Sequence, residues 1–330
     1  MTWVRGAAVF GAAAMALVLT ACGSSSDSGS DSEPDSGSLT LYTCVSDTTI
    51  APVIKAYEKA NPGDKVELFR APTGELNARV AGDIRSGGLR ADVIWACDPL
   101  TMQDYVDQDL VGGWTPKTSV PSEYRTDDYV GVALLYMVAV SGKGATPVQA
   151  WADLTRPPYD GKVALPDPAV AASALGALGY FSANPTFGID FYKDLKDNRA
   201  TQVSTPDEVV TGVAEGTYSA GITTANSAYA AKSNGSPIEV TWPSPGAIGI
   251  YGPVALAEKT DRAAQAKRFI SFVTSREGQE VIAEGGSYPT LPDVPGPTKP
   301  DAAAVVLPDW AKLAASEEDL LGQYQKIFGG

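Results

Sequence analysis

The chain has 330 residues, a formal net charge of −14 and no histidine. The negative charge argues against nucleic acid as a partner, because nucleic acids bind clustered Lys and Arg. The lack of histidine excludes a Ser-His-Asp or Cys-His catalytic site and any zinc site that needs an imidazole ligand. A small anionic ligand is not excluded, since it responds to local dipoles rather than to distant surface charge.

The N-terminus has the order of a bacterial lipoprotein signal. Arg5 gives a short positive region, Gly6 to Leu19 is apolar, and small residues precede Cys22. This pattern predicts a signal peptide at residues 1–21 and a lipid-modified (palmitate-bearing) Cys22; an ordinary signal peptide that contains a cysteine is the alternative. One lipidated cysteine anchors a protein without spanning the bilayer. We therefore expect a lipid-anchored protein at the extracytoplasmic face of the cell membrane.

Residues 22–38 form a stretch rich in Ser, Asp and Gly with almost no apolar side chain. Such a segment cannot bury enough surface to offset its ordering entropy, so it predicts a flexible tether. No later segment is long and apolar enough to cross a membrane. Roughly 290 residues remain after the tether, which is enough for one large core or two lobes. We expect this globular part to be a monomer.

Three β-rich runs alternate with two helical patterns after the tether. Strands are expected at residues 39–44, 65–69 and 91–96. The first helix can be capped by Ser46, Asp47 or Thr48 and stops at Asn61, and the second begins at Thr73. A β-α-β-α-β order with apolar strands predicts a parallel sheet that helices cover on both faces.

The longest apolar run, residues 129–140, predicts a crossover strand that leaves the first lobe. Beyond it, strands at 162–165 and 218–223 alternate with helices near residue 172 and at 207–215, which predicts a second α/β lobe. A return strand is expected at 254–257, with helices at 262–274 and 309–328. The predicted organisation is therefore lobe 1 at 39–137, lobe 2 at 138–250, and the return to lobe 1 with the C-terminal helices at 251–330.

Polar residues follow the predicted strands or begin the predicted helices. In open parallel sheets, ligands collect beyond the carboxyl ends of the strands. Free N–H groups and the positive dipole end at helix starts suit the oxygens of an anion, although Ser, Thr and Asp at these positions can equally be ordinary N-caps. The candidate ligand-binding residues are Ser46, Asp47, Thr48, Thr73, Gly74, Asp98, Ser173, Thr223, Thr224 and Asn226.

Cys44 and Cys97 each end a predicted strand. If these strands are neighbours in the sheet, the two Cα atoms lie about 5 Å apart, within the range of a disulfide. An oxidising extracellular setting favours that bond. The alternative is a pair of buried free thiols.

Several segments together resemble the solute-binding proteins of ABC importers, in the branch that binds ferric ion, phosphorylated sugars or phosphonates. They are LTLYTCVSDTTIAPVIKAYEKANPG, APTGELNARV, ADVIWACDP, FVTSREGQEVIAEGGSYPTLPDVP and LPDWAKL, and the likeness covers Leu39 to Phe328. The resemblance implies a two-lobe α/β fold like the type II periplasmic binding proteins. It also implies a protein without catalysis or cofactor that closes on a solute and delivers it to a membrane permease.

One departure from this resemblance bears on the ligand. Ferric-ion binders of this type usually hold iron with a tyrosine pair just after a second-lobe strand. Here the matching stretch GITTANSAYAAK has Thr224, Ala225 and Asn226 at those positions, with Tyr229 further along. Fe(III) needs anionic oxygen donors, so the departure disfavours iron and favours a phosphonate or organophosphate-like solute. A ferric site with carboxylate or synergistic-anion ligands is the alternative.

Three carboxylates near the predicted rim leave the charge of the solute open. Asp47, Asp98 and Asp167 can bind the ammonium of a zwitterion such as an aminophosphonate, or a cation, or can face solvent as caps. Paired carboxylates can also serve an extracellular glycoside hydrolase, but neither a suitably placed pair nor a nucleophile elbow is evident. A surface adhesin that keeps the fold and binds protein is a further alternative.

Overall fold

The computed structural model describes residues 37–329. The predicted signal peptide, Cys22 and all but the end of the predicted tether lie outside the described residues. Within residues 37–329, no helix combines the length and the apolar character that a membrane span requires.

The first lobe is built by the predicted β-α-β-α-β order. Its elements are β1 (Ser38–Thr43), α1 (Asp47–Ala60), β2 (Lys65–Arg70), α2 (Thr73–Arg85), β3 (Val93–Trp95) and α3 (Pro99–Asp107). Strand β1 lies between β2 and β3 and is parallel to both. The apolar residues of α1 at helical spacing, Ile50, Val53 and Tyr57, have no exposed surface, which is why this segment forms a helix packed on the lobe core.

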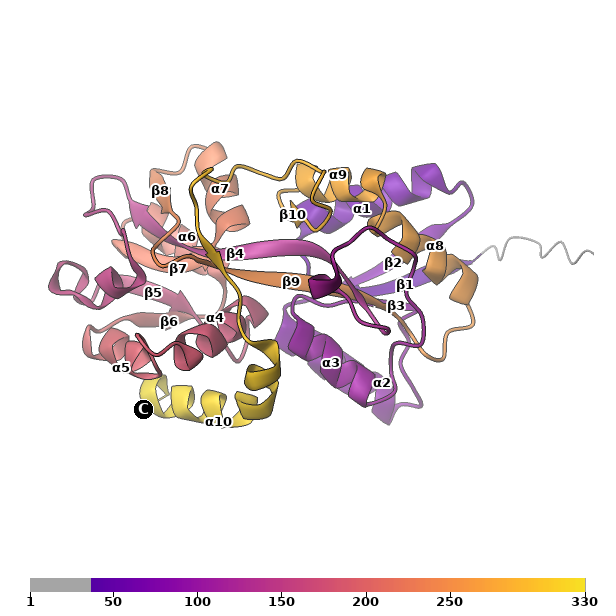
Figure 1. The fold of residues 1–330 in the computed structure, drawn as a ribbon, viewed down its shortest axis with the longest axis horizontal. Coiled ribbons are helices and arrows are strands. Elements are labelled where there is room, and N and C mark those ends of the chain that lie inside the picture. Colours follow the sequence, from indigo (N-terminus) through magenta and orange to yellow (C-terminus); the bar gives the residue numbers. More distant parts are fainter. Residues whose placement is uncertain (1–36, 330) are drawn as a thin grey trace, which may run out of the picture. The chain divides into compact units, whose positions relative to one another are not determined.

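Two long strands, β4 (Val130–Gly142) and β9 (Ala247–Leu256), run through both lobes as an antiparallel pair (Figure 1). A short 3-10 turn at Ser122–Tyr124 precedes β4. The strand order is β2-β1-β3-β9-β4-β7-β5-β6, where β5 is Val163–Pro166, β6 is Thr201–Val203 and β7 is Ala220–Thr224. The two crossover strands therefore join both lobes into one continuous sheet. The lobe boundaries predicted at 137/138 and 250/251 fall inside these strands. The return strand expected at 254–257 begins earlier, at Ala247.

The second lobe repeats the plan of a parallel sheet covered by helices. Its elements are 3-10 turns at Trp151–Thr155 and Pro157–Tyr159, β5 (Val163–Pro166), α4 (Ala172–Ala183), α5 (Asp190–Asp197), β6 (Thr201–Val203), α6 (Pro206–Ala214), β7 (Ala220–Thr224), α7 (Ala225–Ser233) and β8 (Ile238–Thr241). Strand β5 is parallel to both β6 and β7, and β8 pairs antiparallel with β4. The observed lobes confirm the predicted α/β fold class.

The C-terminal segments serve both lobes. They comprise α8 (Ala263–Val273), α9 (Arg276–Glu284), β10 (Tyr288–Pro289), β11 (Val305–Val306) and α10 (Trp310–Phe328). Helix α8 packs on the first lobe, where Phe269 and Phe272 meet the ring of Tyr57 edge-on. Helix α10 packs on the second lobe, where Tyr324 contacts Tyr192 of α5 (Figure 1).

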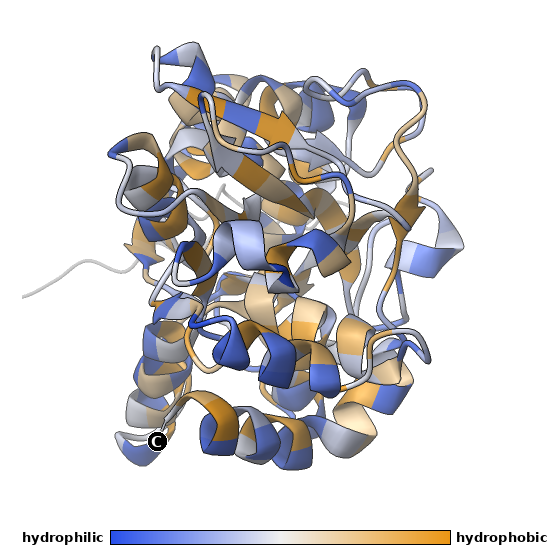
Figure 2. Cartoon of the chain, turned by 90° about the vertical axis from the view of Figure 1, so that its left-hand side faces the viewer, coloured by the Kyte–Doolittle hydropathy of each residue, from blue (hydrophilic) through white to orange (hydrophobic). Residues whose placement is uncertain are grey.

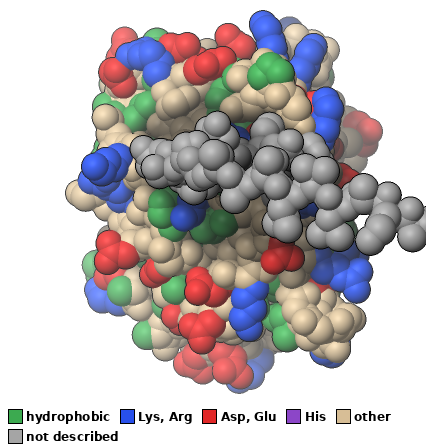
Figure 3. All heavy atoms as spheres, turned by 90° about the vertical axis from the view of Figure 1, so that its right-hand side faces the viewer, with side chains coloured by type: hydrophobic (Ala, Val, Ile, Leu, Met, Phe, Trp, Pro, Cys, Tyr) green, Lys and Arg blue, Asp and Glu red, His purple; other side chains and the backbone are tan. Residues whose placement is uncertain are grey.

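The surface agrees with this layered packing. In Figure 2 the helices near the C-terminus alternate between apolar and polar segments, as expected for helices with one face on a core. On the face drawn in Figure 3, acidic and basic side chains of the described residues are interspersed. Although the net charge of the chain is −14, the acidic side chains on this face are therefore not gathered into one patch.

Candidate functional site

A cavity of about 160 Å³ lies where the two lobes meet. The first lobe contributes residues at the carboxyl ends of β1, β2 and β3, and the second lobe contributes the starts of α4, α6 and α7. The crossover strands contribute Ala133 to Leu135 and Gly252. Residues from both lobes and from the strands that join them therefore line one hollow. It lies beyond the carboxyl ends of the parallel strands, where ligands of such sheets are expected to bind.

Five helix starts converge on this cavity. The lining residues include Ser46 before α1, Thr73 at the start of α2, Ser173 in α4, Asp207 in α6 and Asn226 in α7. Helices α1, α2, α6 and α7 each begin within a few residues of the preceding strand. Each of these helices therefore starts just beyond the carboxyl end of a strand. Helix starts carry N–H groups without intrahelical partners and a positive dipole end, so the cavity wall is rich in donors.

Four of these five helix starts have no side-chain cap. No side chain accepts a hydrogen bond from the first turns of α1, α2, α4 and α7, whereas Thr205 accepts from Glu208 N at 3.2 Å and caps α6. At α2 and α4 the sequence itself explains this, because Pro72 and Ala171 have no side-chain oxygen. Their first-turn N–H groups are left for another acceptor.

Two charged side chains, Arg70 and Asp207, are among the lining residues. Arg70 ends β2, and its Nε donates to the carbonyl oxygen of Val45 at 3.1 Å, which holds the guanidinium beside the start of α1. The sequence prediction missed Arg70 because it ended the strand at Phe69. Had the strand been extended by one residue, Arg70 would have been a candidate at its carboxyl end. The cavity thus combines one cation, one carboxylate and an excess of neutral donors.

Five of the predicted candidates line the cavity: Ser46, Thr73, Ser173, Thr224 and Asn226. A hydroxyl network continues from Ser46 through Thr49 to Ser287, with 2.9 Å between the last two oxygens. Ser287 also lines the cavity, although no local pattern in the sequence points to it. It follows α9, far along the chain from α1, so only the tertiary fold brings it to this wall.

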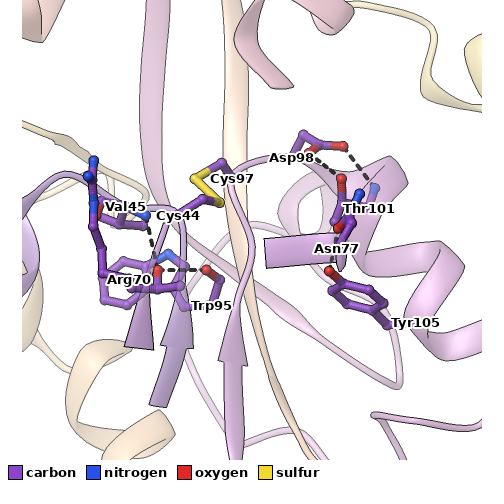
Figure 4. The surroundings of a disulfide bond; sticks show 10 residues. Cys44, Val45, Arg70, Asn77, Trp95, Cys97, Asp98, Thr101 and Tyr105 are labelled. Atoms are coloured by element: carbon purple, nitrogen blue, oxygen red, sulfur yellow. Dashed lines mark hydrogen bonds between the residues drawn. A yellow bond between two sulfur atoms is a disulfide. The ribbon is translucent and has the colours of Figure 1, made fainter. Parts of the chain in front are cut away.

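Asp98 and Thr223 are not among the lining residues, contrary to expectation. Asp98 is fully buried and accepts hydrogen bonds from Thr101 N at 2.9 Å and Thr101 Oγ1 at 2.8 Å, as Figure 4 shows. It caps α3, and burial raises the pKa of its carboxyl. Thr223 is also fully buried, and its hydroxyl donates to the carbonyl of Pro206 at 2.8 Å. Both side chains serve local structure rather than the cavity.

Asp47, Thr48 and Gly74 are exposed and also lie outside the lining. A Cβ added at Gly74 would lie 3.5 Å from the carbonyl oxygen of Ala169, so the start of α2 abuts the loop before α4. Asp167 accepts from Gln202 Nε2 at 2.6 Å and from Ala169 N, and does not line the cavity either. None of the three carboxylates anticipated for an ammonium group therefore reaches this wall.

The structure contains the predicted disulfide between Cys44 and Cys97, with 5.8 Å between the Cα atoms (Figure 4). Strands β1 and β3 are parallel neighbours, so their carboxyl ends place the two cysteines together. Both cysteines line the cavity. The Thr43 hydroxyl reinforces this corner by donating to Trp95 O at 2.7 Å and accepting from Val45 N at 3.1 Å.

The donor set at the cavity does not match Fe(III). No tyrosine is among the lining residues, and Tyr229 instead packs beside Trp242, whose Nε1 donates to its hydroxyl at 3.0 Å. Among residues 37–329, no cluster of three or more Cys, Asp or Glu side chains is placed to hold a metal ion. Neutral hydroxyls and amide N–H groups are poor donors for a hard trivalent cation.

Comparison with known proteins places the chain in a family. The profile of the family described as bacterial extracellular solute-binding protein matches residues 39–287. The spermidine/putrescine-binding periplasmic protein of Escherichia coli is 28% identical over 213 residues, which are 58% of this chain and 61% of that protein. The chain thus spans about three fifths of that relative. The molybdate-binding protein ModA of Mycobacterium tuberculosis is 22% identical over 289 residues, covering 87% of this chain and 98% of ModA.

Solved structures show the same fold. The periplasmic binding protein AfuA from Actinobacillus pleuropneumoniae, with fructose-6-phosphate bound, aligns with a TM-score of 0.77 and 19% identity over 88% of this chain and 98% of AfuA. The apo ferric ion-binding protein A of Pasteurella haemolytica aligns with a TM-score of 0.74 and 20% identity over 88% of this chain and 97% of that protein. At these identities the likeness concerns the fold alone.

Proposed function

The chain belongs to the bacterial extracellular solute-binding proteins, and we propose that it is the binding component of an ABC importer for a small oxyanion-bearing solute. The solute is a phosphonate or an organophosphate-like molecule, captured as the lobes close and then delivered to the permease. The protein acts as a monomer held at the extracytoplasmic face of the membrane by a lipid on Cys22. The observation that carries this proposal is the convergence of five helix starts on one cavity.

Physical chemistry supports an oxyanion at this place. An anion near a helix start accepts from free N–H groups and is favoured by the helix dipole. Four uncapped helix starts can together surround several oxygens of one head group. The Arg70 guanidinium has one donor occupied by Val45 O, and its remaining donors can make charge-assisted bonds to the same head group.

Capture follows from the lobe arrangement. The lobes are joined through β4 and β9, which act as the hinge, and each lobe supplies part of the cavity wall. A solute that contacts both walls binds the closed form better than the open form and shifts the population toward closure. Covalent chemistry is not part of the proposal. A glycoside hydrolase needs two carboxylates, and Asp207 is the one carboxylate among the lining residues.

Two other solutes deserve comparison. The E. coli relative is named for spermidine and putrescine, but a polyamine needs several carboxylates, and here the lining holds one carboxylate, Asp207, together with the cation of Arg70. Ferric iron with carboxylate or synergistic-anion ligands is the alternative function. It would have Asp207 as its protein donor, without the phenolates that favour Fe(III). The charge balance therefore favours an anion or zwitterion over a cation.

A ligand screen tests the proposal. Thermal shift and calorimetry would use inorganic phosphate, molybdate, methylphosphonate, fructose 6-phosphate, spermidine and ferric citrate. We expect a phosphonate or phosphate ester to raise the Tm and, in small-angle scattering, to make the protein more compact. Stabilisation by spermidine or iron with no response to any oxyanion would reject the proposal.

Arg70 offers a matched pair of variants. Arg70→Gln should weaken binding of the responding oxyanion by roughly tenfold to a hundredfold, because it removes a charge-assisted hydrogen bond. Arg85→Gln is the control, since Arg85 is exposed at the opposite end of α2. Equal affinities for the two variants would show that Arg70 does not contact the solute.

A further inference from the structure

Two buried polar atoms of the cavity wall have no hydrogen-bond partner. Trp95 has no exposed surface, yet its indole Nε1, which can only donate, is unpartnered. The Oδ1 of Asn226, an acceptor, is also buried without a partner. Both residues line the cavity, one from the first lobe and the other from the second. Native proteins pair almost all such groups, so each exception calls for an explanation.

A second tryptophan shows the usual outcome. Trp151 is equally buried, and its Nε1 donates to the carbonyl oxygen of Gly246 at 2.9 Å. The other unpartnered buried atoms of the described residues belong to Ser38, Ser182, Gln265 and Tyr324, and none of these residues lines the cavity. Of the described residues with an unpartnered buried polar atom, Trp95 and Asn226 are therefore the two that line the cavity.

The backbone around Trp95 fixes the indole in place and leaves its N–H without a hydrogen-bond partner. Trp95 ends β3, and its carbonyl oxygen accepts from the Thr43 hydroxyl, which fixes the strand end. Gly252 of β9 lies beside the indole ring, two residues before Val254, which pairs with Trp95. A Cβ at Gly252 would lie 3.3 Å from Nε1 and 2.8 Å from the carbonyl oxygen of Ala96. Any larger residue would crowd this corner, so glycine keeps the space beside the buried N–H free of a side chain.

We propose that Trp95 and Asn226 form a second recognition subsite that binds a hydroxyl group of the solute. This inference rests on the proposed function, in which the helix starts and Arg70 hold the oxyanion. A hydroxyl can accept from the indole N–H and donate to the amide oxygen at the same time. A fully ionised oxyanion offers only acceptors and leaves the Asn226 oxygen unmatched. The solute is thus a hydroxylated organic phosphate or phosphonate rather than a bare inorganic oxyanion.

Matched probes test this subsite on the full-length protein. Calorimetry would compare ethylphosphonate with 2-hydroxyethylphosphonate, propyl phosphate with glycerol 3-phosphate, and each with inorganic phosphate. We expect the hydroxylated member of at least one pair to bind about tenfold or more tightly than its partner, because the partner leaves buried polar groups unpaired. Inorganic phosphate should bind more weakly than that hydroxylated probe.

Variants separate recognition from stability. Trp95→Phe should abolish the preference for the hydroxylated probe. It should lower the ligand-free Tm less than Trp151→Phe does, because both variants lose buried ring volume but Trp95→Phe breaks no hydrogen bond of the free protein. Asn226→Ala should also abolish the preference. Trp151→Phe is the matched control: it loses the bond to Gly246 and lowers the Tm, but it should keep the preference.

Each outcome has one meaning. If no oxyanion probe binds, the proposed function fails and the subsite falls with it. If oxyanions bind but both members of each pair bind equally, or inorganic phosphate binds best, the subsite is overturned while the proposed function stands. A preference that survives in both Trp95→Phe and Asn226→Ala assigns hydroxyl recognition to other residues and overturns this inference as well.

Discussion

Helix starts at the cavity and helix starts elsewhere are built differently. Away from the cavity, α3, α9 and α10 begin at Asp98, Ser275 and Asp309, and each side chain accepts a hydrogen bond from the first turn. At the cavity, α2 and α4 begin at Pro72 and Ala171, which cannot accept one. At the cavity, four of five helix starts lack a side-chain cap, and α6, which Thr205 caps, is the exception.

A missing cap alone does not mark a binding site. Helices α5 and α8 also begin without a side-chain cap, and neither start lines the cavity. What distinguishes the cavity is that uncapped starts from both lobes meet there. Each omitted cap forgoes about 1 kcal/mol of helix stability. Such local losses of stability are expected at functional sites, where binding rather than folding uses the free donors.

The disulfide links the uncapped start of α1 to the capped start of α3. Of the changes considered, its removal should lower the unfolding free energy most. Cys44 lies just before Ser46 at the open start of α1, and Cys97 precedes Asp98 at the capped start of α3. The sequence separation is 53 residues. For a loop of that size, a Cys44→Ala/Cys97→Ala variant should lose about 4 kcal/mol of unfolding free energy in urea denaturation.

A reductant supplies the control for this variant. It should lower the stability of the parent protein and leave the double variant unchanged. Equal stability of the parent protein with and without reductant, once free thiols are confirmed by labelling, would contradict the expected role of the bond.

Adding the missing cap tests the comparison directly. Ala171→Asp places an acceptor at the start of α4, where the backbone is already extended as an N-cap requires. We expect the unfolding free energy to rise by about 1 kcal/mol. Binding of the oxyanion should weaken by roughly a hundredfold, because the carboxylate occupies the N–H groups and repels the anion. Calorimetry and thermal denaturation measure the two opposite effects.

Ala171→Ser is the neutral control for that variant and should weaken binding far less. An Ala171→Asp protein that binds the oxyanion as tightly as the parent would show that the start of α4 does not contact the solute.

Removing a cap away from the cavity should do the reverse. Ser275 Oγ accepts from Gly278 N at 3.2 Å and caps α9. Ser275→Ala should lower the unfolding free energy by about 1 kcal/mol and leave oxyanion affinity unchanged. Ser271→Ala, on the preceding helix, is the comparison variant and should cost less. A change in affinity for Ser275→Ala would mean that α9 communicates with the cavity.

The smallest expected effect is a pH dependence near the capped start of α3. Burial raises the pKa of Glu317 in α10 to about 7, and Asp104 and Asp98 add repulsion. The folded protein therefore binds this proton more tightly than the unfolded chain does. The resulting stability is present below the ordinary pKa and is lost as the pH rises through about 7.

Glu317→Gln should remove this loss of stability at high pH. We expect its Tm to exceed that of the parent by roughly 1–2 °C at pH 8, since the half-exposed group is partly screened by solvent, and to match it near pH 4. Glu318→Gln, at the exposed neighbouring position, is the control. Parallel pH profiles for Glu317→Gln and the parent would show that Glu317 titrates normally.

The sequence predicted local features well because they depend on neighbouring residues. The β-α-β-α-β order follows from apolar periodicity. The pairing of Cys44 with Cys97 is not local: its prediction depends on the two strands being neighbours, and the structure places β1 beside β3. Side-chain direction, which position in the chain does not give, decides which candidate residues line the cavity. Asp98 accepts from Thr101, three residues later, and Thr223 donates to Pro206 at the start of α6, so neither side chain lines the cavity.

The sequence by itself determined that helices start just beyond strand ends and that Pro72 and Ala171 leave two of those starts uncapped. These properties act over three or four residues. Only the tertiary structure decided that the starts meet in one hollow, and that Arg70, Trp95 and Ser287 join them. The physical reason is that β4 and β9 carry the chain between lobes, so the wall is assembled from residues whose proximity no local pattern encodes.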